Sequence, residues 1–226
     1  MIVLAEVKYW NGSQWVRLGN EKLKRWDGSK WTTLSVKRWD GSQWQQINNQ
    51  RYTTVYEATW NRSYWGDNTR NLTGINKTRI CQGRYDSPDT YWHGDMGIEK
   101  GMIGFDHNRI RNDLNGAKIE KIELYIENLH FWYWAGGIGF FGVHNNASEP
   151  ARFSETRYGV ASARWYQRGG AKWITLPNYV AEDLKNNRAK GITLHKNSTD
   201  PLYYGYWAGV ADGSKRPKLR ITYVKW

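Results

Sequence analysis

The chain has 226 residues and carries 33 Lys and Arg against 21 Asp and Glu, which gives a formal net charge of +12. This length suits one ordinary domain plus a small extra module, and the single cysteine excludes an intrachain disulfide. No segment approaches the roughly 18 apolar residues of a membrane span, and no run of Lys and Arg indicates a nucleic-acid tail. The basic residues are spread along the chain, and their diffuse positive field favours polyanionic partners.

Residues 1–50 contain one phrase three times: VKYWNGSQWVRL (7–18), LKRWDGSKWTTL (23–34) and VKRWDGSQWQQI (36–47). In each copy, Asn or Asp followed by Gly predicts a hairpin turn, and the Trp residues on either side, such as Trp26 and Trp31, are expected to meet across it. A cross-strand aromatic pair contributes roughly 0.2–1 kcal/mol, which is too little for an isolated hairpin. The hairpins are therefore expected to stack on each other or on copies from other subunits. The alternative is a ligand-binding array with Trp platforms for sugars.

A polar stretch, residues 48–51, predicts a linker, and short strands follow it. The expected strands are TTVYEATW (53–60), MIGFD (102–106), KIEKIELYIENL (118–129), GIGFFGVH (137–144), KWITL (172–176), KGITLH (190–195), LYYGYWAG (202–209) and PKLRITYV (217–224). Residues 179–188 are the only predicted helix. This pattern predicts an all-β protein, with β-hairpin repeats in residues 1–50 and an antiparallel jelly-roll β-sandwich with one short helix in residues 51–226.

Four stretches of the body resemble the DNRLRE-type jelly rolls, which are similar to carbohydrate-binding modules and occur in bacterial surface proteins and bacteriophage tail proteins. These stretches are residues 102–126, with the passage Gly-Ala-x-Ile before a long strand, 172–194, 203–209 and 216–224. The resemblance extends from about residue 55 to residue 224 and rests on scaffold motifs, so it implies a fold and says little about a ligand. The N-terminal phrase is similar to tandem repeats in tail and minor structural proteins of phages of Gram-positive bacteria.

The sequence offers little that is typical of catalysis. The five histidines do not have the spacing of a metal site, and no nucleophile elbow or phosphate-binding loop is visible. Cys81 has basic neighbours that would lower its pKa, but no evident His partner, so it is expected to be packed. None of the carboxylates is singled out as a glycosidase pair. We therefore expect a protein that is not an enzyme and has no cofactor and no bound metal.

Aromatic stretches give the candidate ligand site. HFWYWAGG (130–137) is predicted to be a strand with Trp132 and Trp134 on one face, and RSYWGDN (62–68) and DTYWHGD (89–95) place Tyr-Trp pairs beside turns at the rim of the sandwich. Sugar binding needs an aromatic platform with polar groups nearby. The predicted glycan site consists of four Trp residues and two carboxylates as hydroxyl acceptors: Trp65, Trp92, Trp134, Trp207, Asp67 and Asp95. The alternative is that these aromatics fill the core and subunit contacts.

Together these features predict a non-enzymatic bacteriophage virion protein of the tail or a fibre, which binds a host cell-surface polysaccharide or teichoic acid. Fibre proteins are commonly symmetric trimers, so a homo-oligomer is expected, with a trimer favoured. Other virion proteins are expected partners, and no specific nucleic acid is. The N-terminus lacks the pattern of a secretory signal, which fits a virion component made in the host cytoplasm. The alternatives are a purely structural virion subunit, such as a capsid decoration or head fibre, and a bacterial carbohydrate-binding module.

Overall fold

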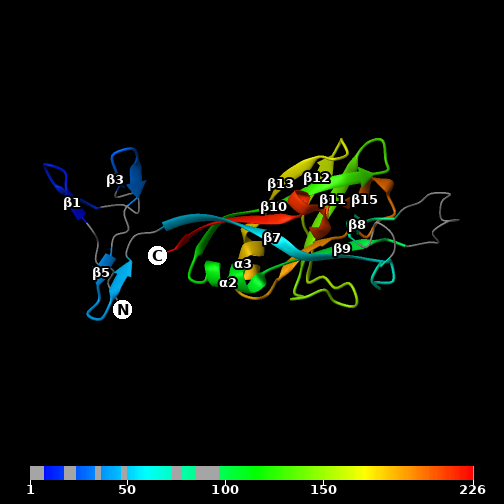
Figure 1. Cartoon of the computed structure of the whole chain (residues 1–226), viewed down its shortest axis with the longest axis horizontal. Coiled ribbons are helices and arrows are strands. Elements are labelled where there is room, and N and C mark those ends of the chain that lie inside the picture. Colours follow the sequence, from blue (N-terminus) through cyan, green and yellow to red (C-terminus); the bar gives the residue numbers. More distant parts are fainter. Residues whose placement is uncertain are drawn as a thin grey trace. The chain divides into compact units, whose positions relative to one another are not determined.

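The computed structural model describes residues 8–17, 24–33, 37–46, 50–72, 78–84 and 97–225. The chain divides into two compact units (Figure 1). Unit 1 comprises Met1–Arg51 with Val224–Trp226, and unit 2 comprises Tyr52–Tyr223.

Unit 1 contains three β-hairpins, each of them a separate two-stranded sheet. Their strands are β1 (Lys8–Trp10) with β2 (Trp15–Arg17), β3 (Lys24–Trp26) with β4 (Trp31–Thr33), and β5 (Lys37–Trp39) with β6 (Trp44–Gln46). Trp26 lies opposite Trp31 in register, so the predicted turn and cross-strand pair are confirmed. Among the described residues, no strand of one hairpin pairs with a strand of another.

Unit 2 is built on one ten-stranded sheet that folds into a sandwich. The path of neighbouring strands is β12-β11-β14-β9-β7-β16-β10-β15-β8, and β13 pairs with β10. The strands are β7 (Gln50–Tyr64), β8 (Ile80–Gln82), β9 (Lys100–Phe105), β10 (Lys118–Phe131), β11 (Gly137–His144), β12 (Arg157–Trp165), β13 (Ala171–Leu176), β14 (Gly191–Leu194), β15 (Gly205–Trp207) and β16 (Lys218–Lys225). Their pairings make the protein mostly antiparallel β, so the predicted all-β class is confirmed.

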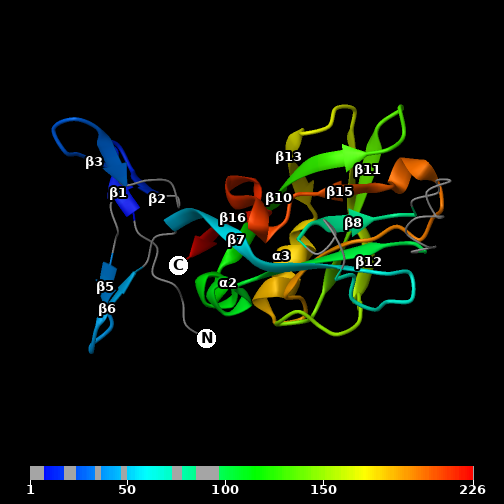
Figure 2. The same cartoon turned by 45° about the vertical axis from the view of Figure 1, so that its right-hand side comes forward.

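Two buried tryptophans show how the sheet closes on itself. Trp165 of β12 and Trp207 of β15 come from strands far apart along the path, yet their ring centroids are 5.6 Å apart. Gly139 of β11 lies between them, because a Cβ at this position would be 3.0 Å from the Trp165 ring and 3.3 Å from the Trp207 ring. The two layers thus pack face to face around one apolar core, and Figure 2 shows the strands of both layers.

Two short α-helices lie at one end of the sandwich (Figure 1). α3 (Asn178–Lys185) corresponds to the predicted helix, but α2 (His107–Leu114) was not predicted. The Asp106 side chain caps α2 by accepting a hydrogen bond from the Arg109 N–H at 3.0 Å, and Ile110 and Leu114, four residues apart, are both buried. The prediction of a single helix was therefore wrong, because one helical turn of apolar spacing is a weak signal.

Two further strands were not predicted. β12 contains mostly small residues and Arg instead of an apolar alternation, and β8 has only three residues. Both are stabilised by neighbours distant in sequence, since β12 pairs with β11 and β8 with β15. The described residues of unit 2 also include two short 3-10 helices, η2 (Pro201–Tyr203) and η3 (Val210–Lys215).

Candidate functional site

The end of the sandwich opposite the helices gathers several connections. Register pairs Tyr64 with Lys100, and Leu194 with both Gly101 and Phe141. The end of β7, the start of β9 and the start of β11 therefore lie at the same end of the sheet. The connections 65–72 and 132–136 leave from this end, and we call it the loop end.

The connection between β10 and β11 carries the most exposed aromatic side chain of the described residues. Trp134 is 87% exposed, Trp132 is 54% exposed, and Phe131 at the end of β10 is buried. The predicted strand over residues 130–137 is wrong, because β10 ends at Phe131 and a turn follows it. In this turn the Gly136 N–H donates to the Tyr133 carbonyl at 3.0 Å. The turn directs both Trp side chains to solvent instead of onto a strand face.

Two arginines hold this connection in place. Arg164 of β12 donates a hydrogen bond to the Ala135 carbonyl at 2.7 Å, and Arg168 donates to the Phe131 carbonyl at 3.0 Å. Tyr166, between them in sequence, is 73% exposed, and the Arg164 guanidinium lies 5.1 Å from the centroid of its ring. The pairing of Gly137 with Trp165 brings the two connections together. We call the four aromatic side chains here, Trp132, Tyr133, Trp134 and Tyr166, the loop-end aromatic cluster.

The charge beside this cluster is positive. Among the described residues, neither Arg164 nor Arg168 forms an ion pair, since the bonds of both go to backbone carbonyls and aromatic rings. A guanidinium that donates to a carbonyl keeps further N–H groups for another acceptor. The cluster thus combines exposed rings with donors suited to hydroxyl, carboxylate or phosphate oxygens.

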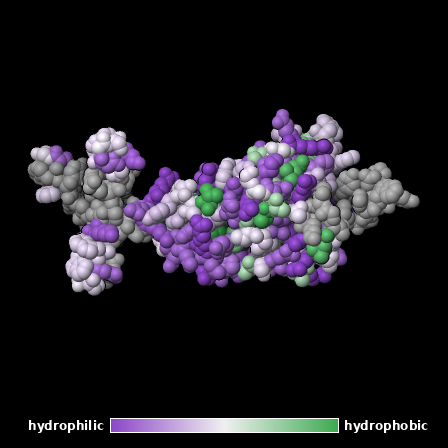
Figure 3. Space-filling model, viewed as in Figure 1, coloured by the Kyte–Doolittle hydropathy of each residue, from purple (hydrophilic) through white to green (hydrophobic). Residues whose placement is uncertain are grey.

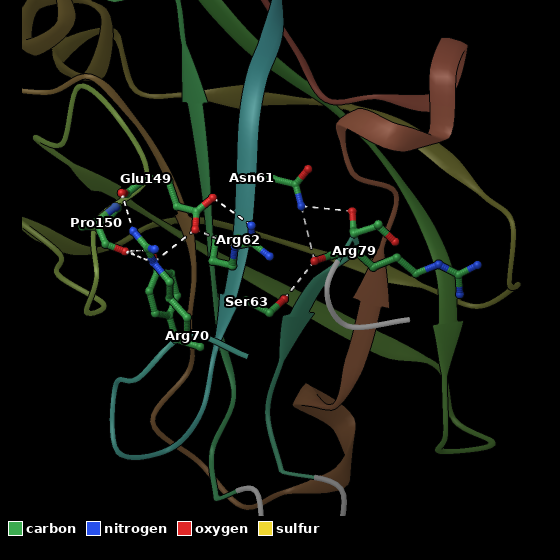
Figure 4. A network of polar contacts seen from close by, with 9 residues as sticks. Asn61, Arg62, Ser63, Arg70, Arg79, Glu149 and Pro150 are labelled. Carbon is green, nitrogen blue, oxygen red and sulfur yellow. Dashed lines mark hydrogen bonds and ion pairs between the residues drawn. The ribbon is translucent and has the colours of Figure 1, made fainter. Parts of the chain in front are cut away.

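The loop at residues 65–72, which carries two predicted site residues, is fixed by a different network (Figure 4). The Glu149 carboxylate pairs with Arg62 at 2.8 Å and with Arg70 at 3.1 Å. Arg70 also donates to the Pro150 carbonyl at 2.8 Å, and the Ser63 hydroxyl donates to the Arg79 carbonyl at 2.9 Å. These contacts tie the end of β7 to residues 149–150 and to Arg79, which precedes β8, and Arg70 anchors the loop to residues 149–150.

Asp67 in this loop serves its own turn. Its Oδ1 accepts hydrogen bonds from the Thr69 N–H at 2.9 Å and from the Thr69 hydroxyl at 2.7 Å, and the first of these bonds contributes most to lowering the pKa of the Asp67 carboxyl. Trp65, which precedes it, is half-buried. Trp65 follows β7, whereas Trp134 follows β10. Trp65 and Trp134 therefore belong to different connections at the same end of the sandwich.

The remaining predicted site residues divide into two groups. Trp207 is fully buried in the core against Trp165, so its prediction as a surface platform is corrected: residue alternation along β15 turns its side chain inward and leaves Tyr206 half-buried. Trp92 and Asp95 lie outside the described residues. Arg164, Tyr166 and Arg168 were not predicted as site residues. The sequence RWYQRGG (164–170), which combines aromatic and basic residues beside two glycines, was the signal that could have indicated them.

The buried titratable groups of unit 2 have structural roles. Burial lowers the pKa of His144 to about 4, and the neutral ring accepts from the Asn146 N–H and bonds to the Ile103 carbonyl at 2.9 Å. Burial raises the pKa of the Cys81 thiol, so its basic neighbours do not activate it. The described residues contain no group of three or more His, Cys, Asp and Glu side chains that would hold a metal ion. Within the same residues, no helix has the length and hydropathy needed to cross a membrane.

The outer surface of unit 2 is largely hydrophilic on the face shown in Figure 3, with small, separate hydrophobic patches. A large apolar patch would indicate an extensive protein interface, and this face has none among its described residues. The sequence matches no protein-family model, and no curated protein matches it either.

Proposed function

We propose that the protein is a non-enzymatic glycan-binding protein of a bacteriophage virion, part of a tail or fibre, and that the loop-end aromatic cluster contacts the glycan. The observation that carries the proposal is the exposure of Trp132, Trp134 and Tyr166 beside two arginines without acidic partners. An exposed indole covers the apolar C–H face of a sugar ring, and arginine donates to its hydroxyl or acidic groups.

The virion assignment rests on the resemblance of the two regions to phage proteins. The Trp-Asp/Asn-Gly-Ser-x-Trp phrase is similar to repeats of tail and minor structural proteins, and the body resembles the jelly rolls found in tail proteins. The net charge of +12 supports a polyanionic target such as teichoic acid.

Binding of purified protein to host cell walls and to a glycan array tests the proposal. Trp134→Ala and Trp132→Ala should each weaken binding by about tenfold or more, which corresponds to about 1.4 kcal/mol. Tyr179→Ala is the matched control, because Tyr179 is also an exposed aromatic residue but lies on α3 at the opposite end. Normal binding by folded Trp132 and Trp134 variants would remove the cluster from the proposal.

Salt dependence distinguishes two target classes. Binding to a teichoic-acid-like polymer should weaken between low and physiological salt, because the Debye length shortens to about 8 Å. A neutral glycan should bind almost independently of salt. Salt-independent binding of a neutral sugar would favour the alternative of a bacterial carbohydrate-binding module.

The second candidate function is a purely structural virion subunit, and the repetition of the hairpin in unit 1 favours it. We expect a homo-oligomer, with a trimer favoured, held in part by residues 1–50. Light scattering at micromolar concentration measures its mass, and deletion of residues 1–50 should reduce the number of subunits. A monomeric full-length chain contradicts this expectation, and so does an unchanged subunit number after the deletion.

A further inference from the structure

Two hairpins of unit 1 present the same surface to solvent. The ring centroids of Trp26 and Trp31 are 5.7 Å apart with planes at 60°, and those of Trp39 and Trp44 are 5.6 Å apart at 61°. The first ring of each pair is 51% exposed and the second 64%. The third hairpin, β1–β2, has the same backbone register at its turn. The repeated sequence therefore gives both hairpins an exposed Trp pair with the same geometry.

The turns are stabilised without using the outer faces of these rings. Oδ1 of Asp27 accepts hydrogen bonds from the Ser29 N–H, the Ser29 hydroxyl and the Lys30 N–H, each at 2.9 Å. Asp40 makes the same three bonds at 2.9 Å, and Asn11 makes them at 2.8–3.0 Å. The fold of each hairpin thus depends on its turn and on ring-to-ring contact, and more than half of the surface of each of these four Trp residues stays exposed.

Basic residues accompany the rings. Lys24 and Lys37 are exposed, and each lies two residues before a Trp on the same strand, so it projects from the same face as that ring. Residues 24–33 carry three basic side chains and one acidic side chain, and residues 37–46 carry two and one. Oδ1 of each acidic side chain is occupied by its own turn. Each face therefore pairs two indoles with a cation.

The positive charge indicates which partner suits this face. A second copy of the hairpin would bring like charges together, and this repulsion opposes self-association through these faces. An anionic chain gains from the same charge, and its sugar rings match the exposed indoles in shape and polarity. We propose that the hairpins are a tandem set of equivalent weak sites for a linear saccharide polymer with an anionic group in each repeat.

Chain connectivity couples these sites. Only residues 34–36 separate β4 from β5, so the ends of the two strands are joined by four Cα–Cα steps and lie at most ~14 Å apart. A polymer held by one hairpin therefore meets the next at a high effective concentration, and linked sites can exceed the affinity of one site by about 10²–10⁴. Affinity should rise with polymer length. This inference concerns unit 1 and does not depend on the loop-end aromatic cluster.

Fluorescence anisotropy with the full-length chain and labelled hyaluronan tests the inference, since hyaluronan carries one carboxylate in each disaccharide. Long hyaluronan should bind at least about tenfold more tightly than a tetrasaccharide at physiological salt. Dextran of equal length has sugar rings without charge, and polyphosphate has charge without rings, so both should bind at least about tenfold more weakly than long hyaluronan.

Variants separate the contributions of ring and charge. Trp31→Ala combined with Trp44→Ala should weaken hyaluronan binding by at least about tenfold, whereas Trp31→Phe combined with Trp44→Phe should retain most of it. Lys24→Gln combined with Lys37→Gln should weaken binding of hyaluronan but not of dextran. If the Ala variant does not fold, the Phe and Gln variants still test the roles of the aromatic rings and of the lysine charges. Tyr179→Ala, which lies outside both proposed sites, should leave hyaluronan binding and its length dependence unchanged. The Trp31 and Trp44 variants keep the loop-end aromatic cluster intact, so failure of this inference and failure of the proposed function are distinguishable.

Several results would overturn the inference. These are affinity that is independent of polymer length, polyphosphate binding equal to hyaluronan binding, and unchanged binding by the folded Ala variant. If single-stranded poly(dT) binds more tightly and needs the same Trp residues, the occupant is a nucleic acid. If the Ala variant changes the oligomer mass in light scattering but binds hyaluronan normally, the rings form an assembly surface.

Discussion

The two units use tryptophan in opposite ways. In the hairpins, Trp26 and Trp31 are more than half exposed and contact each other across a turn. In the sandwich, Trp165 and Trp207 are almost completely buried, and their contact joins two layers. An exposed cross-strand pair contributes at most about 1 kcal/mol, whereas burial of a large aromatic ring contributes several times more. Tryptophan thus forms exposed cross-strand pairs in one unit and part of the buried core in the other.

The largest expected difference between the units comes from removing a core ring. Trp207→Ala should lower the unfolding free energy of the sandwich by about 3–5 kcal/mol, because it leaves a cavity beside Trp165. Urea denaturation followed by far-ultraviolet circular dichroism measures this loss. Trp134→Ala is the control and should change stability by at most about 0.5 kcal/mol, since its ring is exposed. Equal losses in the two variants would contradict the assignment of Trp207 to the core.

A change of pH should also separate the units. The pKa of His144 is lowered to about 4 by burial, so below pH 6.5 the unfolded chain binds a proton that the folded chain does not. Stability of the sandwich should therefore fall as pH decreases from 6.5 to 4, by about 2 kcal/mol between pH 8 and pH 5 from this group alone. Residues 1–50 contain no histidine, so the hairpins should not show this loss. NMR titration of His144 checks the cause, and a pKa near 6.5 would refute it.

Glycine replacement in the turns should reverse the pattern and affect only the hairpins. Gly28 and Gly41 have φ of +102° and +107°, and a β-branched side chain there costs about 1–3 kcal/mol. An isolated hairpin is marginally stable, so Gly28→Val and Gly41→Val should make residues 1–50 sensitive to protease while the sandwich stays resistant. Lys30→Val is the control, because this turn position is exposed and needs no positive φ. Unchanged protease resistance in both Gly variants would show that the hairpin register is wrong.

The smallest expected effect concerns the capping side chain of one turn. Asp27→Ala removes three hydrogen bonds and should increase proteolysis at the second hairpin. Asp27→Asn should behave like the parent protein near neutral pH, since Asn11 makes the same bonds in the first hairpin. Hydrogen bonds, that of the Lys30 N–H foremost, lower the pKa of Asp27. These hydrogen bonds therefore stabilise the hairpin fully above the ordinary pKa of Asp, and the stabilisation is lost as pH falls through the lowered pKa of Asp27. The Asn variant should not show this pH dependence.

The sequence determined the parts of this protein that depend on neighbouring residues. The hairpin turns follow from Asn or Asp before Gly, and the Trp pairs follow from their spacing across the turn. The long strands β10 and β11 were visible in their apolar content, and α3 in its apolar spacing. The all-β class follows from these local signals, which is why the sequence was sufficient to predict it.

Tertiary structure decided the features that depend on distant residues. β12 has no apolar alternation and is a strand because β11 pairs with it. Trp134 and Trp207 both looked like surface platforms, yet one is at a turn and the other is in the core. The loop-end aromatic cluster needs Arg164 and Arg168 to hold a loop some thirty residues earlier in the chain. An aromatic ring has the same local signal whether it is buried or exposed, because only packing across the sheet determines which of its faces meets water.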